Sequence, residues 1–275
     1  MARCCVAAWA PRCALGASMR RPVRWCLVSA AIAVCASVCC QGGAANALAV
    51  SPHARGSTEV RPGVYVPPSQ DLSLGDQGPA VLSVQQRLAQ LGYYPGPTDG
   101  VYGPDLEEAV WAFKEVQGLP LLNGSSYIGP DFLAALAYPV QPQALVPGGG
   151  ANRIEINQTI QVLVLYQDNQ PALILHVSTG GRYYFCNKGS CGYAVTPDGD
   201  FTALSYLAGD IQVPLGFMEN PVFFIGRAYA IHGGDPVPWY PASHGCVRIY
   251  ADAVDWFHND VQIGATPIYI RGTAP

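Results

Sequence analysis

The sequence predicts a multidomain α+β protein, in which a three-helix domain is followed by a mostly-β, sandwich-like domain. Apolar residues recur at helical spacing in residues 71–138, whereas residues 152–272 contain short apolar runs typical of strands. Between them, residues 139–151 are rich in proline and glycine, which is typical of a linker. The chain has 275 residues, 50% of them hydrophobic, so it is long enough to build two modest cores.

The first 47 residues have the pattern of an export signal. They contain five arginines and no acidic residue, and an uncharged stretch from Trp25 to Cys40 follows the last arginine. Ala45-Asn46-Ala47 fits the small-residue rule for signal-peptide cleavage, and the apolar stretch is short for a membrane span. Met19 is an alternative start, and an uncleaved membrane anchor is the competing interpretation of this segment.

Beyond residue 47 the chain is acidic. All 19 aspartates and glutamates lie there, against 10 of the 15 lysines and arginines, which gives a formal charge of −9. A surface of this sign repels a phosphate backbone, and no basic cluster interrupts it. Nucleic acid is therefore not a predicted partner.

Three amphipathic helices are predicted in residues 71–138, after a tether at residues 48–70 that is rich in proline, serine and glycine. Proline suits the first turn of a helix, and glycine suits the position just after its end. The expected helices begin at Pro79 and end at Gly92, span Asp105–Gln117, and run from Pro130 to Ala137.

Residues 152–272 are expected to form mainly strands. Two apolar runs, Gln161–Tyr166 and Ala172–Val177, flank a short turn segment and predict a hairpin. Further strand-like runs lie at Val222–Ile225, Arg227–His232 and Thr266–Ile270, and one helix is expected at about 251–258. Glycine and proline separate these runs, which favours a sandwich.

Three cysteines remain beyond the predicted signal: Cys186, Cys191 and Cys246. An exported protein with three cysteines is expected to pair two of them. Cys186 and Cys191 bracket a turn-like segment and are the expected disulfide, whose small loop contributes about 2 kcal/mol to stability. If these two bound a metal instead, the site would need two more ligands, and only His176 is near in sequence. No metal site is therefore predicted.

The unpaired Cys246 lies in a segment suited to nucleophilic catalysis. His232 and His244 precede it by 14 and 2 positions, and a nearby base makes a thiol a strong nucleophile. Gly245 permits a sharp turn that exposes backbone N–H groups beside the sulfur, as in an oxyanion hole. The segment predicts acyl transfer through a thioester, although a lone cysteine is more often a small buried apolar residue.

Five short motifs in the helical segment carry a resemblance to a known family. They are Leu74-Gly75-Asp76-Gln77-Gly78, Val84-Gln85-Gln86-Arg87-Leu88, Leu91-Gly92-Tyr93-Tyr94, Asp99-Gly100-Val101-Tyr102-Gly103 and Ala109-Val110-Trp111-Ala112-Phe113-Lys114. With them, residues 71–138 resemble the peptidoglycan-binding domain type 1 family, a three-helix module. The resemblance implies that this module holds the protein on peptidoglycan and raises the local substrate concentration.

Two later motifs, Ile231-His232-Gly233-Gly234 and Ala242–Ile249, carry a second resemblance. Residues 152–271 resemble the L,D-transpeptidase catalytic domain, also called the YkuD domain, whose signature is His-Gly followed by Ser-His-Gly-Cys-(Val/Ile)-Arg. Thr196-Pro197-x-Gly199-x-Phe201 and Gly264-x-Thr266-Pro267-x-Tyr269-Ile270 agree with it. Two features depart from the usual pattern: Gly234 stands where the family often has threonine, and residues 235–241 form a short, proline-rich segment expected to line the substrate cleft.

The second resemblance implies a role for each residue of the signature. Cys246 is the nucleophile, His232 is the general acid and base, and the backbone oxygen of Gly233 orients the imidazole. The nucleophile turn is shaped by Ser243, His244 and Gly245, whose amides are oxyanion-hole candidates. Arg248 either positions this turn or binds a substrate carboxylate.

The implied reaction is the formation of 3→3 peptidoglycan cross-links without a metal or organic cofactor. The donor is a tetrapeptide stem that loses its terminal D-Ala, and the acceptor is an amine of a neighbouring stem. Hydrolysis of the same thioester would make the protein an L,D-carboxypeptidase, and a catalytically idle wall-binding scaffold is a further alternative. A sortase is disfavoured because its Thr-Leu-x-Thr-Cys setting is absent. The protein is expected to be extracytoplasmic and wall-associated, and to contact a membrane only through an uncleaved signal.

Overall fold

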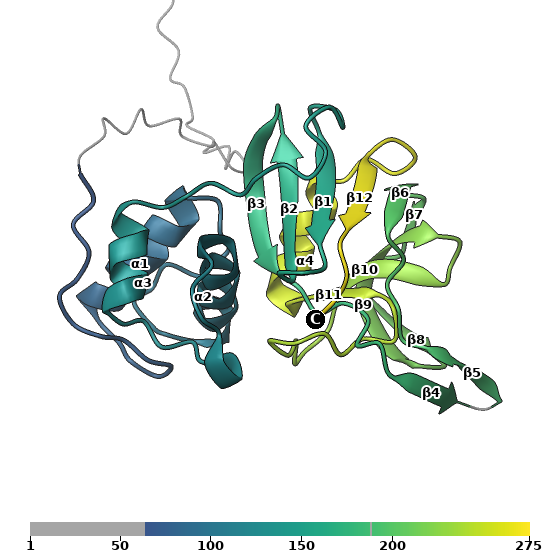
Figure 1. Ribbon diagram of the computed structural model, residues 1–275, viewed down its shortest axis with the longest axis horizontal. Helices are drawn as coiled ribbons and strands as arrows, with labels where there is room; N and C mark the ends of the chain where they lie inside the picture. The colour runs from purple at the N-terminus through teal and green to yellow at the C-terminus, as the bar shows by residue number, and fades with distance from the viewer. Residues whose placement is uncertain (1–63, 188) are drawn as a thin grey trace, which may run out of the picture. The chain divides into compact units, whose positions relative to one another are not determined.

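The computed structural model describes residues 64–187 and 189–275 (Figure 1). The predicted export signal at 1–47, with its alternative start at Met19, and most of the predicted tether at 48–70 lie outside the described residues. In the two ranges that are described, no helix is long and apolar enough to cross a membrane. All of these residues fall in one compact unit.

Three helices form in the first part, as the sequence predicts: α1 (Pro79–Gln90), α2 (Pro104–Gln117) and α3 (Pro130–Ala137). A glycine precedes each of them and a proline is their first residue. Proline favours this position because its φ suits the helix and its missing N–H would have no partner in the first turn. Gly118 directly follows α2, and its φ of 67° is the left-handed conformation of a C-terminal stop.

The helices share one apolar cluster, in which Phe113 of α2 packs against Phe132 of α3 at a ring distance of 4.7 Å. Its other helical members are Val81, Val84, Leu88, Leu106, Ala109, Val110, Ala112, Leu133 and Leu136. The cluster continues onto strand residues such as Val164 and Ile174. The predicted helical domain and the strands that follow it thus share buried apolar contacts, which no local sequence pattern signals.

One sheet of the second part holds five strands in the spatial order β3-β2-β1-β12-β6. Their bounds are β1 (Arg153–Asn157), β2 (Val162–Gln167), β3 (Gln170–His176), β6 (Gly199–Thr202) and β12 (Pro267–Arg271). β1 and β12 run parallel, with Ile154 opposite Ile268, and the other neighbours are antiparallel. The predicted hairpin is confirmed as β2 and β3.

A second sheet has the order β11-β10-β9-β7, and β8 also pairs with β9. The bounds are β7 (Ser205–Tyr206), β8 (Asp210–Val213), β9 (Gly216–Ile225), β10 (Tyr229–Gly233) and β11 (Val247–Ile249). β4 (Tyr184–Asn187) and β5 (Ser190–Tyr193) form a separate hairpin, and the short helices are η1 (Leu122–Gly124), α4 (Ala251–Phe257) and η2 (His258–Asp260).

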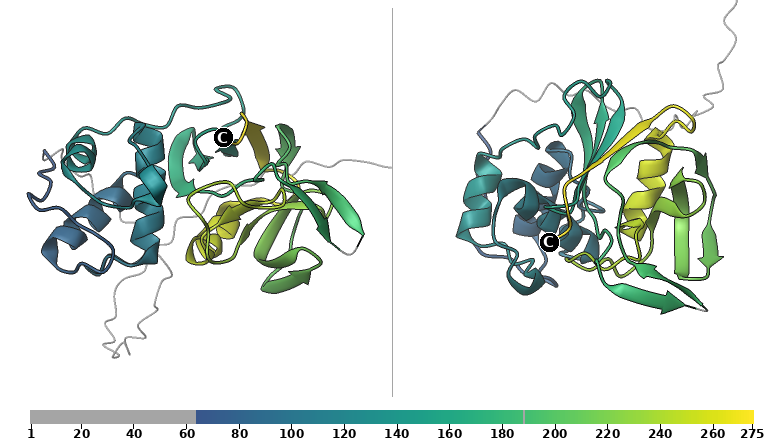
Figure 2. Two further views of the ribbon diagram at one scale, coloured as in Figure 1. Left: turned by 60° about the horizontal axis from the view of Figure 1, so that its bottom comes forward. Right: turned by 45° about the vertical axis from the view of Figure 1, so that its right-hand side comes forward.

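The two larger sheets enclose one apolar core, which confirms the mostly-β, two-sheet prediction (Figure 2). Ile154 and Leu165 from the first sheet meet Ile231 and Val247 from the second within this cluster. Helix α4 adds Ala253, Val254 and Phe257 to the same core. β10 carries His232 next to its last residue, and Cys246 directly precedes the first residue of β11.

Candidate active site

The predicted catalytic residues Cys246 and His232 stand at two neighbouring parallel strands. Cys246 immediately precedes β11, and β11 lies beside β10 with Arg248 opposite His232. Among the described residues Cys246 is the free cysteine. Its partly buried side chain packs against an apolar cluster of Met218, Phe223 and Ala230, and its Sγ lies 3.9 Å from the carbonyl oxygen of Ala228.

His232 is held in one tautomer by its neighbour. Its Nδ1 lies 2.7 Å from the carbonyl oxygen of Gly233, and because a carbonyl only accepts, Nδ1 carries the proton. Burial, together with the charge of Arg248, lowers the pKa of His232 to about 4, although the bond to Gly233 opposes this. The imidazole is therefore neutral near pH 7, with Nε2 unprotonated and able to accept a proton.

Burial also disfavours the charged form of the Cys246 thiol. It raises the pKa of Cys246 above its ordinary value, against the opposing effect of a backbone hydrogen bond at Ala230. Near neutral pH the resting pair is therefore a thiol and a neutral imidazole. Such a pair reacts when the base removes the thiol proton during attack.

The turn before Cys246 needs glycine at position 245. Its φ is 141°, and a Cβ there would lie 2.7 Å from Cε1 of Tyr229 and 2.9 Å from the carbonyl oxygen of Val195. The Ser243 hydroxyl donates to the Cys246 carbonyl at 2.5 Å and accepts from the Gly245 amide at 3.0 Å. Thr196, whose contribution was not predicted, donates from its Oγ1 to the Gly245 carbonyl at 2.8 Å.

These bonds reduce the number of candidate donors to the predicted oxyanion hole. The Gly245 amide donates to Ser243 Oγ, and the Ser243 amide donates to the Thr179 carbonyl at 3.0 Å. Both donors are already used within the turn, so neither is available for a developing oxyanion. Of the three amides that the sequence predicted, that of His244 is the remaining candidate.

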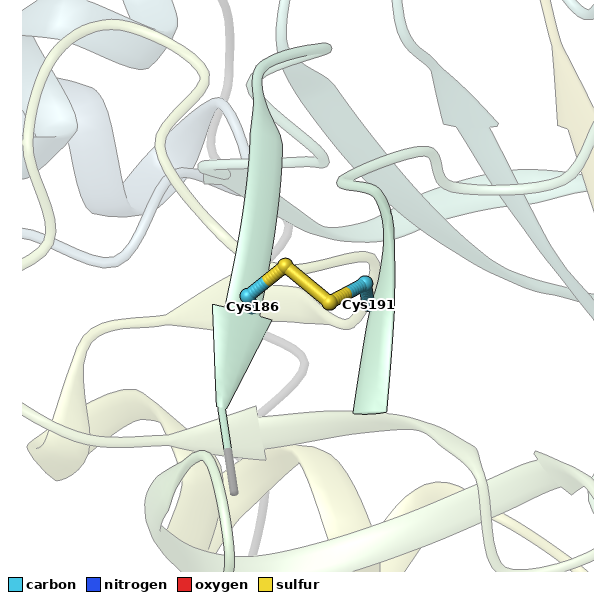
Figure 3. The surroundings of a disulfide bond; sticks show 2 residues. All are labelled: Cys186 and Cys191. Atoms are coloured by element: carbon cyan, nitrogen blue, oxygen red, sulfur yellow. A yellow bond between two sulfur atoms is a disulfide. The ribbon is translucent and has the colours of Figure 1, made fainter. Parts of the chain in front are cut away.

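The His244 ring packs against the β4–β5 hairpin. Its centroid lies 4.7 Å from that of Phe185 and 5.6 Å from that of Tyr183, with edge-on geometry in both pairs. Cys186 and Cys191 lie opposite each other in this hairpin and form the predicted disulfide (Figure 3). The hairpin that it closes thus supports one side of the nucleophile turn.

Arg248 contacts the cleft segment, by which we mean residues 235–241. Its Nη2 donates to the carbonyl oxygen of Gly234 at 3.2 Å and also to that of Pro236. Ser178, just after β3, donates from its hydroxyl to the Tyr240 carbonyl at 2.8 Å and accepts from the Ala242 amide at 3.0 Å.

His176, at the end of β3, also belongs to this environment. The sequence suggested it only as a possible partner of Cys186 and Cys191 in a metal site. Its Nδ1 instead lies 2.8 and 3.0 Å from the two carboxylate oxygens of Glu115, and its Nε2 lies 3.1 Å from the Pro238 carbonyl. These partners lie about 60 residues away in the chain, so no local motif signals the contact.

Comparisons with known proteins match both parts of the chain. The family model for a peptidoglycan binding domain matches residues 77–136, and that of the L,D-transpeptidase catalytic domain (YkuD) matches residues 151–270. The crystal structure of an L,D-transpeptidase from Xylanimonas cellulosilytica is 35% identical with a TM-score of 0.68, and the match covers 74% of this chain and 99% of that one. One from Stackebrandtia nassauensis is 18% identical with a TM-score of 0.43, over 76% of this chain and 98% of that one.

A shorter match involves the localization factor PodJL of Caulobacter vibrioides, which is 50% identical over 56 residues. It covers 18% of this chain and only 6% of that protein, so it concerns a small part of PodJL.

The two-sheet fold and these matches define an enzyme that acts on peptidoglycan. The chain belongs to the L,D-transpeptidase (YkuD) family, and a peptidoglycan-binding domain precedes its catalytic domain.

Proposed function

We propose that this L,D-transpeptidase is exported and forms 3→3 peptidoglycan cross-links through a thioester on Cys246. The observation that carries the proposal is the state of His232: a buried, neutral imidazole with Nδ1–H fixed on Gly233, on the strand beside the one that Cys246 precedes. This arrangement leaves Nε2 as a base for the thiol. The disulfide between Cys186 and Cys191 supports export, because such bonds persist in oxidising compartments.

In the acylation step, Nε2 of His232 takes the thiol proton as Sγ of Cys246 attacks the carbonyl carbon that precedes the terminal D-Ala. The amide nitrogen of D-Ala then leaves with that proton, and the stem remains attached to sulfur as a thioester. The backbone amide of His244 is our candidate donor to the oxyanion. The buried thiol needs no permanent negative charge, because the proton moves during attack.

In the second step, an amine of a neighbouring stem attacks the thioester carbonyl. His232 accepts a proton from this amine and returns it to the departing sulfur of Cys246, which restores the resting pair. Water in place of the amine would give a carboxypeptidase. The access of each nucleophile depends on the cleft segment, whose backbone Arg248 and Ser178 hold.

The test is to incubate the purified protein with disaccharide-tetrapeptide and to analyse the products by mass spectrometry, with Cys246→Ala as the control. We expect the wild-type protein alone to produce a dimer that lacks one D-Ala. Tripeptide and free D-Ala without dimer would mean a carboxypeptidase. If neither protein reacts but both bind peptidoglycan sacculi, the chain is a binding scaffold and the proposal is wrong.

A further inference from the structure

Side chains from outside the cleft segment bind alternate carbonyl groups of this segment and of Gly234, the residue before it. Arg248 takes those of Gly234 and Pro236, His176 takes that of Pro238, and Ser178 takes that of Tyr240. Prolines cannot donate backbone hydrogen bonds, so a proline-rich segment depends on such acceptor contacts for its shape. The conformation of this segment is therefore set by a few named side chains.

His176 differs from the others because it is also bound from the peptidoglycan-binding domain. Its Nδ1 faces both carboxylate oxygens of Glu115 on α2, at 2.8 and 3.0 Å, and the imidazole is buried. Nε2 must carry a proton, because its partner, the Pro238 carbonyl, only accepts. A second proton lies between Nδ1 and the carboxylate, so the imidazole is fixed at both nitrogens.

The same domain touches the cleft segment at a second point. A Cβ built on Gly124 would lie 2.2 Å from Cδ1 of Trp239, so the indole rests directly on the Gly124 backbone. The Gly124 carbonyl accepts a hydrogen bond from Nε1 of Trp111 on α2 at 2.9 Å, and the Trp111 ring packs edge-on against His176 at 5.4 Å. Trp239 and Pro238 are thus both held by contacts that lead to α2.

We propose that His176 is a positioning residue for the transpeptidase reaction, which couples the peptidoglycan-binding domain to the substrate cleft through Glu115 and Pro238. This proposal rests on the proposed function, and it adds a second role for the helical domain. Besides binding the wall, that domain fixes part of the predicted substrate cleft. His176 does not touch the reacting atoms, so its loss should weaken donor binding more than the chemistry at Cys246.

Two substitutions of similar size distinguish the hydrogen bond between His176 and Pro238 from simple packing. In His176→Asn the side-chain amide reaches the position of Nδ1 and keeps the contact with Glu115, but it loses Pro238. In His176→Gln the longer side chain places its amide nitrogen near the position of Nε2 and keeps the bond to Pro238. We expect H176N to lower kcat/KM for disaccharide-tetrapeptide about tenfold, chiefly through KM, the usual effect of losing one buried hydrogen bond. H176Q should stay within about threefold of wild type, since it keeps that bond.

Two further readouts distinguish this proposal from a loss of fold or of function. Alkylation of Cys246 by iodoacetamide needs no cleft segment and should proceed at the wild-type rate in both variants. Hydrogen–deuterium exchange of a peptide covering residues 235–242 should be faster in H176N but not in H176Q. Equal losses in both variants, or no loss in either, would overturn the proposal.

A failure of the proposed function would look different. If wild type is alkylated but makes no product from the tetrapeptide, the proposed function fails, and exchange of residues 235–242 still decides the role of His176. If H176N does not fold, two substitutions of Glu115 provide a second pair of variants. Glu115→Gln keeps a donor toward Nδ1 and should behave like wild type. Glu115→Leu leaves Nδ1 without a partner and the ring free to turn away from Pro238, so it should match the loss expected of H176N. Equal behaviour of that pair would again overturn the proposal.

Discussion

Protonation of His232 sets how the site responds to acid. In the proposed mechanism His232 is the general base and must be neutral, and burial keeps it so by lowering its pKa to about 4, below the ordinary value near 6.5. As the pH falls, the cation that blocks the reaction should form only as the pH passes about 4. An ordinary, exposed histidine would already be mostly protonated at pH 5.5.

We therefore expect kcat/KM for the tetrapeptide donor to stay near its neutral value down to pH 5 and to fall by half near pH 4. The measurement is a profile of kcat/KM between pH 3.5 and 8, with circular dichroism at each point to show that the fold persists. An acid limb centred near pH 6.5 would contradict the burial argument. His232→Ala should remove activity across the whole range.

Sequence patterns predict the role of some residues of the candidate site and not of others. His232 and Cys246 stand in short motifs, and their proximity follows once the two motifs lie on paired strands. Thr196 stands in a family motif, but its contact with Gly245 and that of His176 with Pro238 join residues 49 and 62 positions apart. Such contacts depend on how whole elements pack, so the spacing of residue types along the chain does not reveal them.

At the scale of elements, the β4–β5 hairpin has two chemically different faces. Tyr184 lies opposite Tyr193, their rings are 5.3 Å apart, and both side chains are exposed. Phe185 alternates to the other face and packs edge-on against His244 in the nucleophile turn. Alternation along a strand therefore gives neighbouring aromatic residues different roles.

We expect Phe185→Ala to lower kcat/KM about threefold or more, because an edge-on aromatic pair is worth roughly 1 kcal/mol and its loss frees the His244 ring. Tyr184→Ala is the matched control and should leave kcat/KM unchanged. The measurement is steady-state turnover of disaccharide-tetrapeptide by both variants, with thermal unfolding to compare their stability. If the two variants behave alike, the hairpin does not support the turn.

Helices and strands differ in how far the sequence predicts them. α1, α2 and α3 follow from proline after glycine and from apolar spacing, because both are local. The short strands β6, β7 and β8 were not predicted, since each has at most four residues and pairs with a distant partner. The β4–β5 hairpin was anticipated only as a turn closed by a disulfide.

For the whole molecule, the contact between α2 and the catalytic domain makes stability depend on pH. Burial raises the pKa of Glu108 to about 8, and within the described residues its Oε2 is enclosed without a hydrogen-bond partner. Burial disfavours the His176 cation, but Glu115, Glu108 and the Pro238 carbonyl outweigh burial and raise the pKa of His176 to about 9. Near neutral pH the native protein therefore holds protons that the unfolded chain has released.

The sign of the pH effect is the same for both groups. When a pKa is higher in the native state, the stability it contributes is present below the unfolded pKa and is lost as the pH rises toward the native pKa. For Glu108 that window runs from about 4.5 to about 8, and for His176 from about 6.5 to about 9. Both therefore lower the free energy of unfolding as the pH rises from 6.5 to 8.

Glu108→Gln tests this directly, because the amide has the same shape and does not ionise. We expect the free energy of unfolding of E108Q to exceed that of wild type by a margin that widens between pH 5 and 8 and is constant above about 8.5. Urea unfolding at half-unit pH steps measures that margin. Some decline should persist in E108Q, because His176 still loses its proton as the pH approaches 9. A margin that does not change with pH would mean that Glu108 is already ionised at pH 5, and that burial of this α2 side chain does not hold its proton.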